Sequence, residues 1–301
     1  MLLDEGSQLA PGYEVLGHLS RGADLDVYDA WSLDRDCRCV IKVMRPDRAG
    51  HVPARERLVE EGRLLLGLAH PHLVRCYEIL EHPPAVVLET LTGATLARII
   101  AERRRRLPAA DLCHLGLHLC SAIGYLHRQG ILHLDLKPSN VISEMGHAKV
   151  IDLSLARPSG RVEAGLGTRQ YLAPEQARGD TVTTASDVFG IGGVLFAAAT
   201  ATRPFPRPDG PYEQLERRAV RVRTLRRLAS ELAATIDACL EPAPRDRPTV
   251  GEVRRTLDDA LTEPVAPPAP RGRIMMAAPR QDTTASAPGR TAKTASPTSP
   301  M

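Results

Sequence analysis

One short segment constrains this chain of 301 residues more than any other. Residues 131–142 form an apolar run that carries three polar groups, Asp135, Lys137 and Asn140. Phosphoryl transfer needs a carboxylate to accept a hydroxyl proton, a cation near the moving group and an amide oxygen for a metal ion. The segment supplies one of each, so it predicts a structured loop that carries out this chemistry.

A second carboxylate, Asp152, follows twelve residues after Asn140, at the end of the β-type run 150–153. Carboxylate oxygens bind hard divalent cations, so Asp152 is a candidate ligand for a metal ion that bridges phosphates. Two ordinary turns with acidic residues are the alternative interpretation. The occurrence of both motifs in this order favours the functional one.

The spacing of apolar residues predicts an α+β chain with two lobes. Residues 13–91 read as a small β-rich lobe with one main helix, and residues 92–262 as a larger, mostly helical lobe. The clearest strands are expected at residues 39–44 and 85–88, and the clearest helices at residues 54–68, 112–126, 188–199 and 232–240. Residues 1–12 are interpreted as an N-terminal extension. Residues 263–301, with eight prolines and few large apolar groups, are expected to be a disordered tail with no identified partner.

The predicted small lobe contains a lysine and a glutamate that are expected to form an ion pair. Lys42 shares a strand face with Val40, and Glu61 falls in the apolar stripe of the helix expected at residues 54–68. A lone buried charge is costly, so the two are expected to pair. Glu60 is the competing choice, but it points off that stripe.

These segments resemble the catalytic loop and metal-binding motif of the eukaryotic-like (Hanks-type) Ser/Thr protein kinase family, including its bacterial members. The similarity runs from about residue 16 to residue 261. It implies the bilobal kinase fold and transfer of the γ-phosphoryl group of ATP, with Mg²⁺ or alternatively Mn²⁺, to Ser/Thr hydroxyls of a protein substrate. By the same resemblance, Asp135 is the catalytic base, Lys137 the lysine of the Ser/Thr branch, and Asn140 and Asp152 the metal ligands.

Other positions take their roles from this resemblance alone. Residues 167–175 resemble the end of the activation segment, where Thr168 would bond near Asp135 and Lys137. Asp187 would anchor the catalytic-loop backbone, and Arg247 would pair with Glu175. The implied nucleotide-binding residues in the phosphate loop, adenine pocket, ion pair and hinge are Leu19, Ser20, Gly22, Val27, Val40, Lys42, Glu61, Glu89, Leu91 and Ile142.

The sequence departs from the family pattern at several positions. In the phosphate loop only Gly22 remains of three glycines, and Asp24 adds a negative charge, so weakened ATP binding is expected. Ser154 replaces the glycine of the metal motif. Leu134 stands where regulated kinases carry an arginine that receives a phosphorylated activation loop, which predicts that loop phosphate does not switch this protein.

Composition excludes some functions. The net charge of +3 is small and is matched by the surplus in residues 263–301, so a nucleic-acid partner is not expected. No apolar segment is long enough to span a bilayer and no leader is visible, which predicts a cytoplasmic protein. The spacing of His114 and His118, without an acidic third ligand, argues against a metal site there.

Two alternatives to an active protein kinase stay open. A pseudokinase that acts as a binding or scaffold module would explain the eroded glycine loop and Ser154. A small-molecule phosphotransferase shares the arrangement around Asp135 and Asn140. It lacks the Lys137-Pro138 pair and the segment at residues 173–175, and is ranked last.

Overall fold

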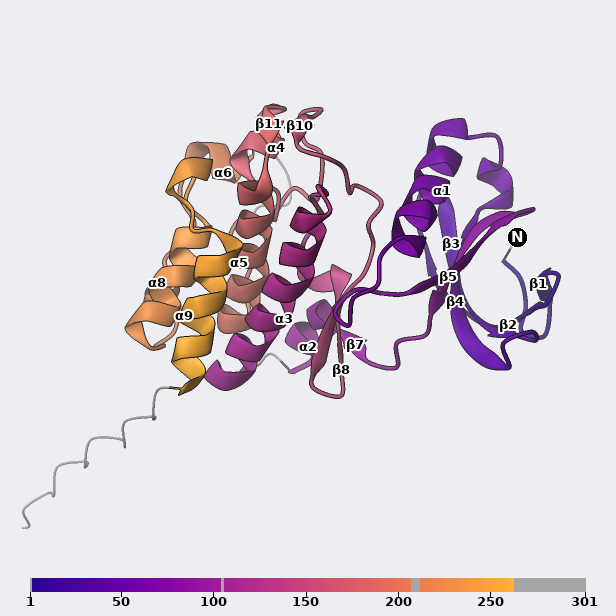
Figure 1. The fold of residues 1–301 in the computed structure, drawn as a ribbon, viewed down its shortest axis with the longest axis horizontal. Coiled ribbons are helices and arrows are strands. Elements are labelled where there is room, and N and C mark those ends of the chain that lie inside the picture. The colour runs from indigo at the N-terminus through magenta and orange to yellow at the C-terminus, as the bar shows by residue number, and fades with distance from the viewer. Residues whose placement is uncertain (1, 104–105, 207–211, 263–301) are drawn as a thin grey trace, which may run out of the picture. The chain divides into compact units, whose positions relative to one another are not determined.

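The computed structural model describes residues 2–103, 106–206 and 212–262 of the chain. The tail expected at residues 263–301 lies outside the described residues. The described part consists of a β-rich lobe with one long helix and a larger helical lobe (Figure 1). The predicted α+β bilobal fold is confirmed.

The β-rich lobe is built on a six-stranded antiparallel sheet in the order β1-β2-β3-β4-β6-β5. Its strands are β1 (Gln8–Ala10), β2 (Tyr13–Arg21), β3 (Leu25–Ser32), β4 (Cys37–Met44), β5 (Cys76–Glu81) and β6 (Pro84–Glu89). Strand β1 pairs with β2 at the edge of the sheet. Part of the segment 1–12, interpreted from the sequence as an extension, is therefore a strand of this lobe.

Strand β4 places its side chains alternately on the two faces of the sheet. Cys39, Ile41 and Val43 are buried in the apolar cluster on one face. Val40 and Lys42 therefore occupy the opposite face, because successive side chains of a strand alternate. Val40 there packs against the cluster that continues into the helical lobe. The alternation read from the sequence thus aims Lys42 away from the inner core of the sheet.

Helix α1 (Val52–Leu66) lies against strands β5 and β6. A proline in its first turn suits the helix start, and the helix ends at Gly67. Leu58, Glu61 and Leu65 are buried along one stripe, as the spacing predicted. The helix begins and ends two residues earlier than expected, and Glu60 is exposed.

The helical lobe is arranged around α3 and α5, which contact each other and pack against α9 and α8 respectively. The helices are α2 (Leu96–Arg103), α3 (Ala109–Arg128), α4 (Pro174–Arg178), α5 (Thr184–Thr200), α6 (Glu213–Glu216), α7 (Val222–Leu225), α8 (Ser230–Cys239) and α9 (Val250–Thr262), with 3₁₀ turns η1 (Pro46–Arg48), η2 (Pro138–Asn140) and η3 (Pro244–Asp246). None of the described helices is long and apolar enough to cross a lipid bilayer.

Helix α5 is buried on nearly every side, which explains its apolar sequence without a polar face. Its first turn is capped by Thr183, whose hydroxyl accepts a hydrogen bond from the Ala185 N–H at 3.3 Å. The buried start of this helix also carries Ser186 and Asp187. These polar side chains must find partners inside the lobe.

Two small sheets complete the helical lobe and hold the loops that carry polar groups. Strands β7 (Ala94–Thr95), β8 (Val141–Glu144) and β9 (His147–Val150) form one, and β10 (Gly160–Arg161) with β11 (Thr181–Val182) forms the other. All pairings are antiparallel. The β8–β9 hairpin connects the segment around Asn140 with the one around Asp152.

A buried ion pair joins α4 to the segment before α9. Both nitrogens of the Arg247 guanidinium fork donate to the Glu175 carboxylate, at 2.7 and 2.8 Å, and Ser186 Oγ adds a third bond at 2.7 Å. Burial raises the pKa of Glu175, but the bonds and charge of Arg247 outweigh it and hold that pKa below its usual value. The sequence resemblance implied this pair.

Replacing Arg247 with Leu should lower the free energy of unfolding by about 3–5 kcal/mol, because a buried carboxylate loses its only fork partner. Arg245→Leu is the matched control. The Arg245 side chain is 88% exposed, so this substitution should change the free energy of unfolding by no more than about 0.5 kcal/mol. Denaturant unfolding measures both.

The same pair predicts a pH dependence. A carboxyl whose pKa is lowered on folding stabilises the protein at pH values above its pKa in the unfolded chain, which is about 4.3. This contribution to stability is lost as the pH falls from that value through the lower pKa of the folded state. The difference in the free energy of unfolding between the parent chain and the Arg247→Leu variant should therefore become smaller below about pH 4.3. A gap that stays constant down to pH 3 would contradict this assignment.

Candidate active site

Lys42 lies between two carboxylates that come from distant parts of the chain. Its Nζ is 2.7 Å from Glu61 Oε1 on α1 and 3.3 Å from Asp152 Oδ1 just after β9. Glu61 Oε1 also accepts the backbone N–H of Leu153 at 3.1 Å. The structure therefore pairs Lys42 with Glu61 rather than Glu60, and attaches that pair to the Asp152 segment.

Burial and charge act in opposite directions on this group. Burial lowers the pKa of Lys42, but the two carboxylates outweigh it and the net pKa is raised. Burial raises the pKa of Asp152, but the charge of Lys42 together with a hydrogen bond from the Ser154 side chain outweighs burial and lowers this pKa to about 2. Lys42 and Asp152 are both charged at neutral pH. Burial raises the pKa of Glu61 above its usual value.

Asp135, Lys137 and Thr168 form a second group. Lys137 Nζ donates to Asp135 Oδ2 at 2.5 Å and to Thr168 Oγ1 at 2.7 Å. Thr168 in turn donates to Asp135 Oδ1 through both its hydroxyl, at 2.7 Å, and its backbone N–H, at 3.0 Å. Thr168 thus positions the carboxylate that the sequence singled out as a proton acceptor.

Asn140 connects the two groups. Its side-chain Nδ2 donates to the backbone oxygen of Asp135 at 3.0 Å and to Asp135 Oδ2 at 3.2 Å. Its own backbone oxygen accepts the N–H of Ile151, the residue before Asp152, at 2.9 Å. The carboxylates of Asp135 and Asp152 therefore belong to one connected region, although 17 positions separate them in the printed sequence.

The donor atoms in this region suit a hard divalent cation. Asn140 uses its amide nitrogen on Asp135, which leaves the amide oxygen as the atom it can offer to a metal ion. The Asp152 side chain is 30% exposed, so its carboxylate is accessible. Amide and carboxylate oxygens are the ligands that Mg²⁺ prefers. The residues present therefore fit the family's metal site.

Asp187 binds the backbone of the predicted catalytic loop. Its two oxygens accept the N–H groups of His133 at 2.9 Å and Leu134 at 2.8 Å, and His127 Nε2 lies 2.8 Å from Oδ2. Leu134 has a φ of +63°, an uncommon value for a bulky residue. The bond from Asp187, together with one from Gln176 to the Leu134 carbonyl at 2.8 Å, stabilises that conformation.

The segment expected to form a degraded phosphate loop is the tight turn between β2 and β3. Gly22 N donates to Leu25 O at 2.8 Å, and Ser20 and Gly22 are both exposed. Asp24, expected to repel phosphate unless it faced solvent, is instead 2.9 Å from His51 Nδ1 and 3.8 Å from Arg57. Its charge is directed to the start of α1.

The residues implied for the adenine pocket are less tightly gathered. Val27, Val40 and Ile142 are half-buried on β3, β4 and β8, whereas Leu19 is 56% exposed. Leu91 and Val40 border the same apolar cluster. The Glu89 side chain lies 2.5 Å from Lys149 and the Glu89 N–H donates to the Arg75 carbonyl at 2.9 Å, so neither group is free to bind a nucleotide.

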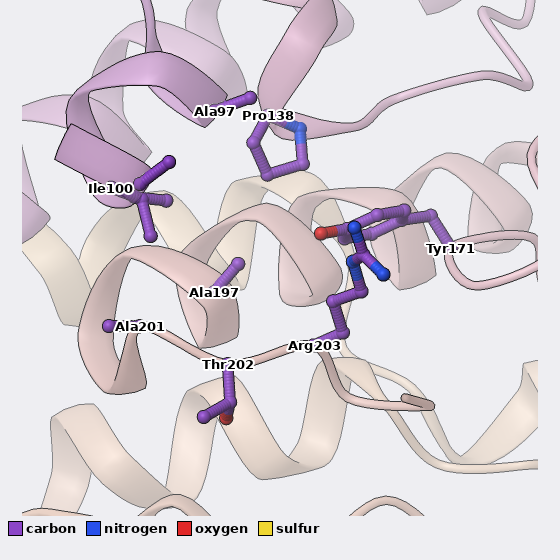
Figure 2. A pocket seen from close by; sticks show the side chains of 9 residues that line it. Ala97, Ile100, Pro138, Tyr171, Ala197, Ala201, Thr202 and Arg203 are labelled. Carbon is purple, nitrogen blue, oxygen red and sulfur yellow. The ribbon is translucent and has the colours of Figure 1, made fainter. Parts of the chain in front are cut away.

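A pocket of about 540 Å³ lies beside the catalytic loop (Figure 2). Its lining comes from α2, the loop at Pro138, the segment after Thr168 and the end of α5, namely Ala97, Ile100, Ala101, Pro138, Tyr171, Ala197, Ala201, Thr202 and Arg203. The Arg203 guanidinium lies beside Tyr171 and supplies the one positive charge among these lining residues.

Several residues of this region carry no local signal in the sequence. Arg203 is one of many arginines in the chain, and nothing in its local pattern brings it to Pro138. Gln176 was also missed, although it donates to the carbonyls of both Leu134 and Leu166. Its place two residues after Pro174 is the only hint, because that position opens a helix next to the activation segment.

Comparison with known proteins identifies the family. The family described as "Protein kinase domain" matches residues 13–257. A probable serine/threonine-protein kinase of Streptomyces coelicolor is 32% identical over 67% of this chain and 32% of its own length, and the serine/threonine-protein kinase PknB of Mycobacterium tuberculosis (strain H37Rv) is 34% identical over 66% and 34%. This chain thus spans about a third of the length of these relatives.

A solved structure supports the fold independently. The crystal structure of the Mycobacterium tuberculosis PknI kinase domain superposes with a TM-score of 0.67 at 22% identity, covering 86% of this chain and 100% of that one. At that identity the likeness speaks for the fold alone. Together with the family match over most of the sequence, it shows that the chain belongs to the protein kinase family.

Proposed function

We propose that this protein is an active serine/threonine protein kinase that transfers the γ-phosphoryl group of ATP to a protein hydroxyl. The observation that carries the proposal is the connection of two charged groups, Lys42–Glu61–Asp152 and Asp135–Lys137–Thr168, through Asn140. Each group alone could be an ordinary ion-pair network. Their juxtaposition across the two lobes is the arrangement that phosphoryl transfer requires.

In this proposal each residue has one task. Asp135, held by Thr168 and Lys137, accepts the proton of the attacking hydroxyl. Lys137 lies next to it and stabilises charge on the transferred group, whereas Lys42 holds the α and β phosphates. Asn140 and Asp152 would hold Mg²⁺, for which Mn²⁺ can substitute; the bound ion supplies charge that neutralises the phosphates.

The nucleotide sits between the lobes in this proposal. Leu19, Val27 and Val40 would cover the adenine ring and Ile142 would lie beneath it, while the backbone from Glu89 to Leu91 would bind its edge. Ser20 and Gly22 would approach the phosphates. Leu19 is 56% exposed, so this side chain would gain apolar contact by covering the adenine ring.

The activation segment supports activity without loop phosphorylation. Leu134 packs with Leu132, Val162 and Val182 in a separate apolar cluster, which attaches the segment to the catalytic loop. In many regulated kinases an arginine at this position binds a phosphate on the activation segment. Here apolar contacts of Leu134 attach the activation segment to the catalytic loop without a charge. Ser159 is exposed.

A protein substrate is favoured over a small molecule by the surroundings of Asp135. The pocket beside Pro138 (Figure 2) offers room for a substrate side chain, and Pro138 directly follows Lys137 in the chain. Arg203 in the lining favours an acidic side chain there. A cytoplasmic location agrees with the six free cysteines, five of them buried, because thiols stay reduced in that compartment.

The first test compares the parent chain with Asp135→Asn in a transfer assay with labelled ATP, Mg²⁺ and a generic basic protein. Loss of the proton acceptor should lower the rate by about 10²- to 10⁴-fold. ATP binding without transfer by the parent chain would instead support the pseudokinase alternative. Transfer only to small molecules would support the phosphotransferase alternative.

The ion pair has a neighbouring control in the same helix. Glu61→Gln should lower kcat/KM for ATP about 30-fold or more, because a buried charge pair worth at least ~2 kcal/mol is broken. Glu60→Gln, at an exposed position one residue away, should stay within about twofold of the parent chain. Equal effects of the two substitutions would refute the role of Glu61.

The activation mechanism is tested by two substitutions. Ser159→Ala should leave kcat unchanged, since no phosphate is needed at that residue. Leu134→Ala should lower kcat and destabilise the protein by about 2–5 kcal/mol, because it leaves a cavity in the cluster. A large loss of activity in Ser159→Ala would contradict the phosphate-independent mechanism.

A further inference from the structure

Three histidines from separate segments meet on the side of the molecule where the loop after α1 contacts the helical lobe. His72 lies in that loop, His118 on α3 and His147 at the start of β9. One ring nitrogen of each lies within 4.8 Å of the corresponding nitrogens of the other two. It is the only group of three or more potential metal-ligating side chains found among the described residues.

The rings are close and nearly parallel. The centroids of His72 and His118 are 4.1 Å apart with the planes at 21°, and His147 lies 5.6 Å from His118 and 6.1 Å from His72. His72 and His118 are half-buried and His147 is exposed. Solvent can therefore reach the group from the side of His147.

Two of the three rings favour the neutral form, which is the form that binds metal ions. Burial lowers the pKa of His72, and burial together with the charges of neighbouring histidines lowers the pKa of His118 to about 4. Both rings are therefore neutral at pH 7, with one lone pair each. A group of three imidazoles whose ring nitrogens lie within 4.8 Å of one another, without a carboxylate among them, suits a cation better than a proton relay.

We propose that His72, His118 and His147 bind one divalent transition-metal ion, with Zn²⁺ preferred and water as the fourth ligand. Imidazole nitrogen favours Zn²⁺, Co²⁺, Ni²⁺ and Cu²⁺ over Mg²⁺ and Ca²⁺, which take oxygen ligands. This site is therefore chemically distinct from the oxygen ligands Asn140 and Asp152.

The hydrogen bonds of His72 and His118 indicate which nitrogen of each ring can bind the metal ion. His72 Nδ1 is 2.9 Å from the Ala148 carbonyl, which can only accept, so Nε2 carries the lone pair. A bond from a ligating histidine to a backbone carbonyl is the usual outer contact of a metal site. His118 Nδ1 accepts the Ala148 N–H at 3.2 Å, and the ring gives up this long bond as it turns its lone pair to the ion.

The remaining movement is small. Nitrogens around a tetrahedral zinc ion are about 3.4 Å apart, given a Zn–N distance of about 2.0–2.1 Å. The present separations of the ring nitrogens are at most 4.8 Å, so rotation of the side chains can bring the nitrogens to the distances that zinc requires. His147 is exposed and can make most of that adjustment.

A bound ion would reinforce an existing connection between the lobes. The His72 carbonyl already accepts the Val150 N–H at 2.9 Å, and Val74 N donates to Val150 O at 3.0 Å. The loop with these bonds follows α1, which carries Glu61. The ion would therefore tie the helix that positions Glu61 more firmly to α3 and β9, and binding should raise thermal stability.

The test uses the full chain without an affinity tag, freed of metal with a chelator and titrated with Co²⁺ and Zn²⁺. We expect one ion per chain, a visible Co²⁺ absorption of tetrahedral type, and a melting temperature that rises with ion concentration. His118→Gln, and His147→Gln at the exposed position, should each raise the dissociation constant for the metal ion by more than about tenfold.

Two control variants locate the ion. His114→Gln lies one turn earlier on α3 outside the group, and Asp152→Asn removes the oxygen site; both should keep the Co²⁺ spectrum and the affinity. The proposal is overturned if no stoichiometric Zn²⁺ or Co²⁺ site exists, or if neither His118→Gln nor His147→Gln weakens it. Loss of binding in either control variant would overturn it as well.

Discussion

The arrangement of the two lobes around the site depends on the buried ammonium of Lys42. Burial opposes its charge, and only the carboxylates of Glu61 and Asp152 keep it protonated. One of these comes from the helix of the β-rich lobe and the other from the loop after β9. Satisfying a single cation thus requires the sheet, α1 and the helical lobe to meet at one point, which is where a nucleotide with several negative charges would bind.

A second constraint comes from the backbone of the catalytic loop. Asp187, at the buried start of α5, accepts two consecutive N–H groups of that loop and holds Leu134 in a left-handed conformation. The most deeply buried helix of the lobe therefore sets the position of Asp135. Leu134 also packs against the activation segment, so the loop and the segment are ordered by the same residue.

Much of the fold was predictable because its signals are local. The alternation in residues 39–44 and the apolar stripe around Glu61 come from the periods of a strand and a helix, and both appear in the structure within about two residues at their ends. The pairing of Glu61 with Lys42 followed from the cost of two lone buried charges. The edge strand β1 was not predicted, since three residues carry too little pattern.

Other features depended on contacts between distant segments. Asp24 places a negative charge in the segment expected to approach phosphate, and no local rule indicated that His51 Nδ1 would lie 2.9 Å from its carboxylate. Local spacing relates His118 only to His114 of the same helix, whereas the structure places it beside His72 and His147. The other two histidines come from a loop and a strand that meet it only in the folded chain.

The sequence by itself determined the residue types of the site, their order along the chain and the class of the fold, because motif chemistry and hydrophobic period are properties of short segments. Only the tertiary structure decided which charges neutralise one another, which side chains line the pocket beside Pro138, and that three histidines converge. Those outcomes depend on distances between segments far apart in sequence, which are set by the packing of the whole core rather than by any local pattern.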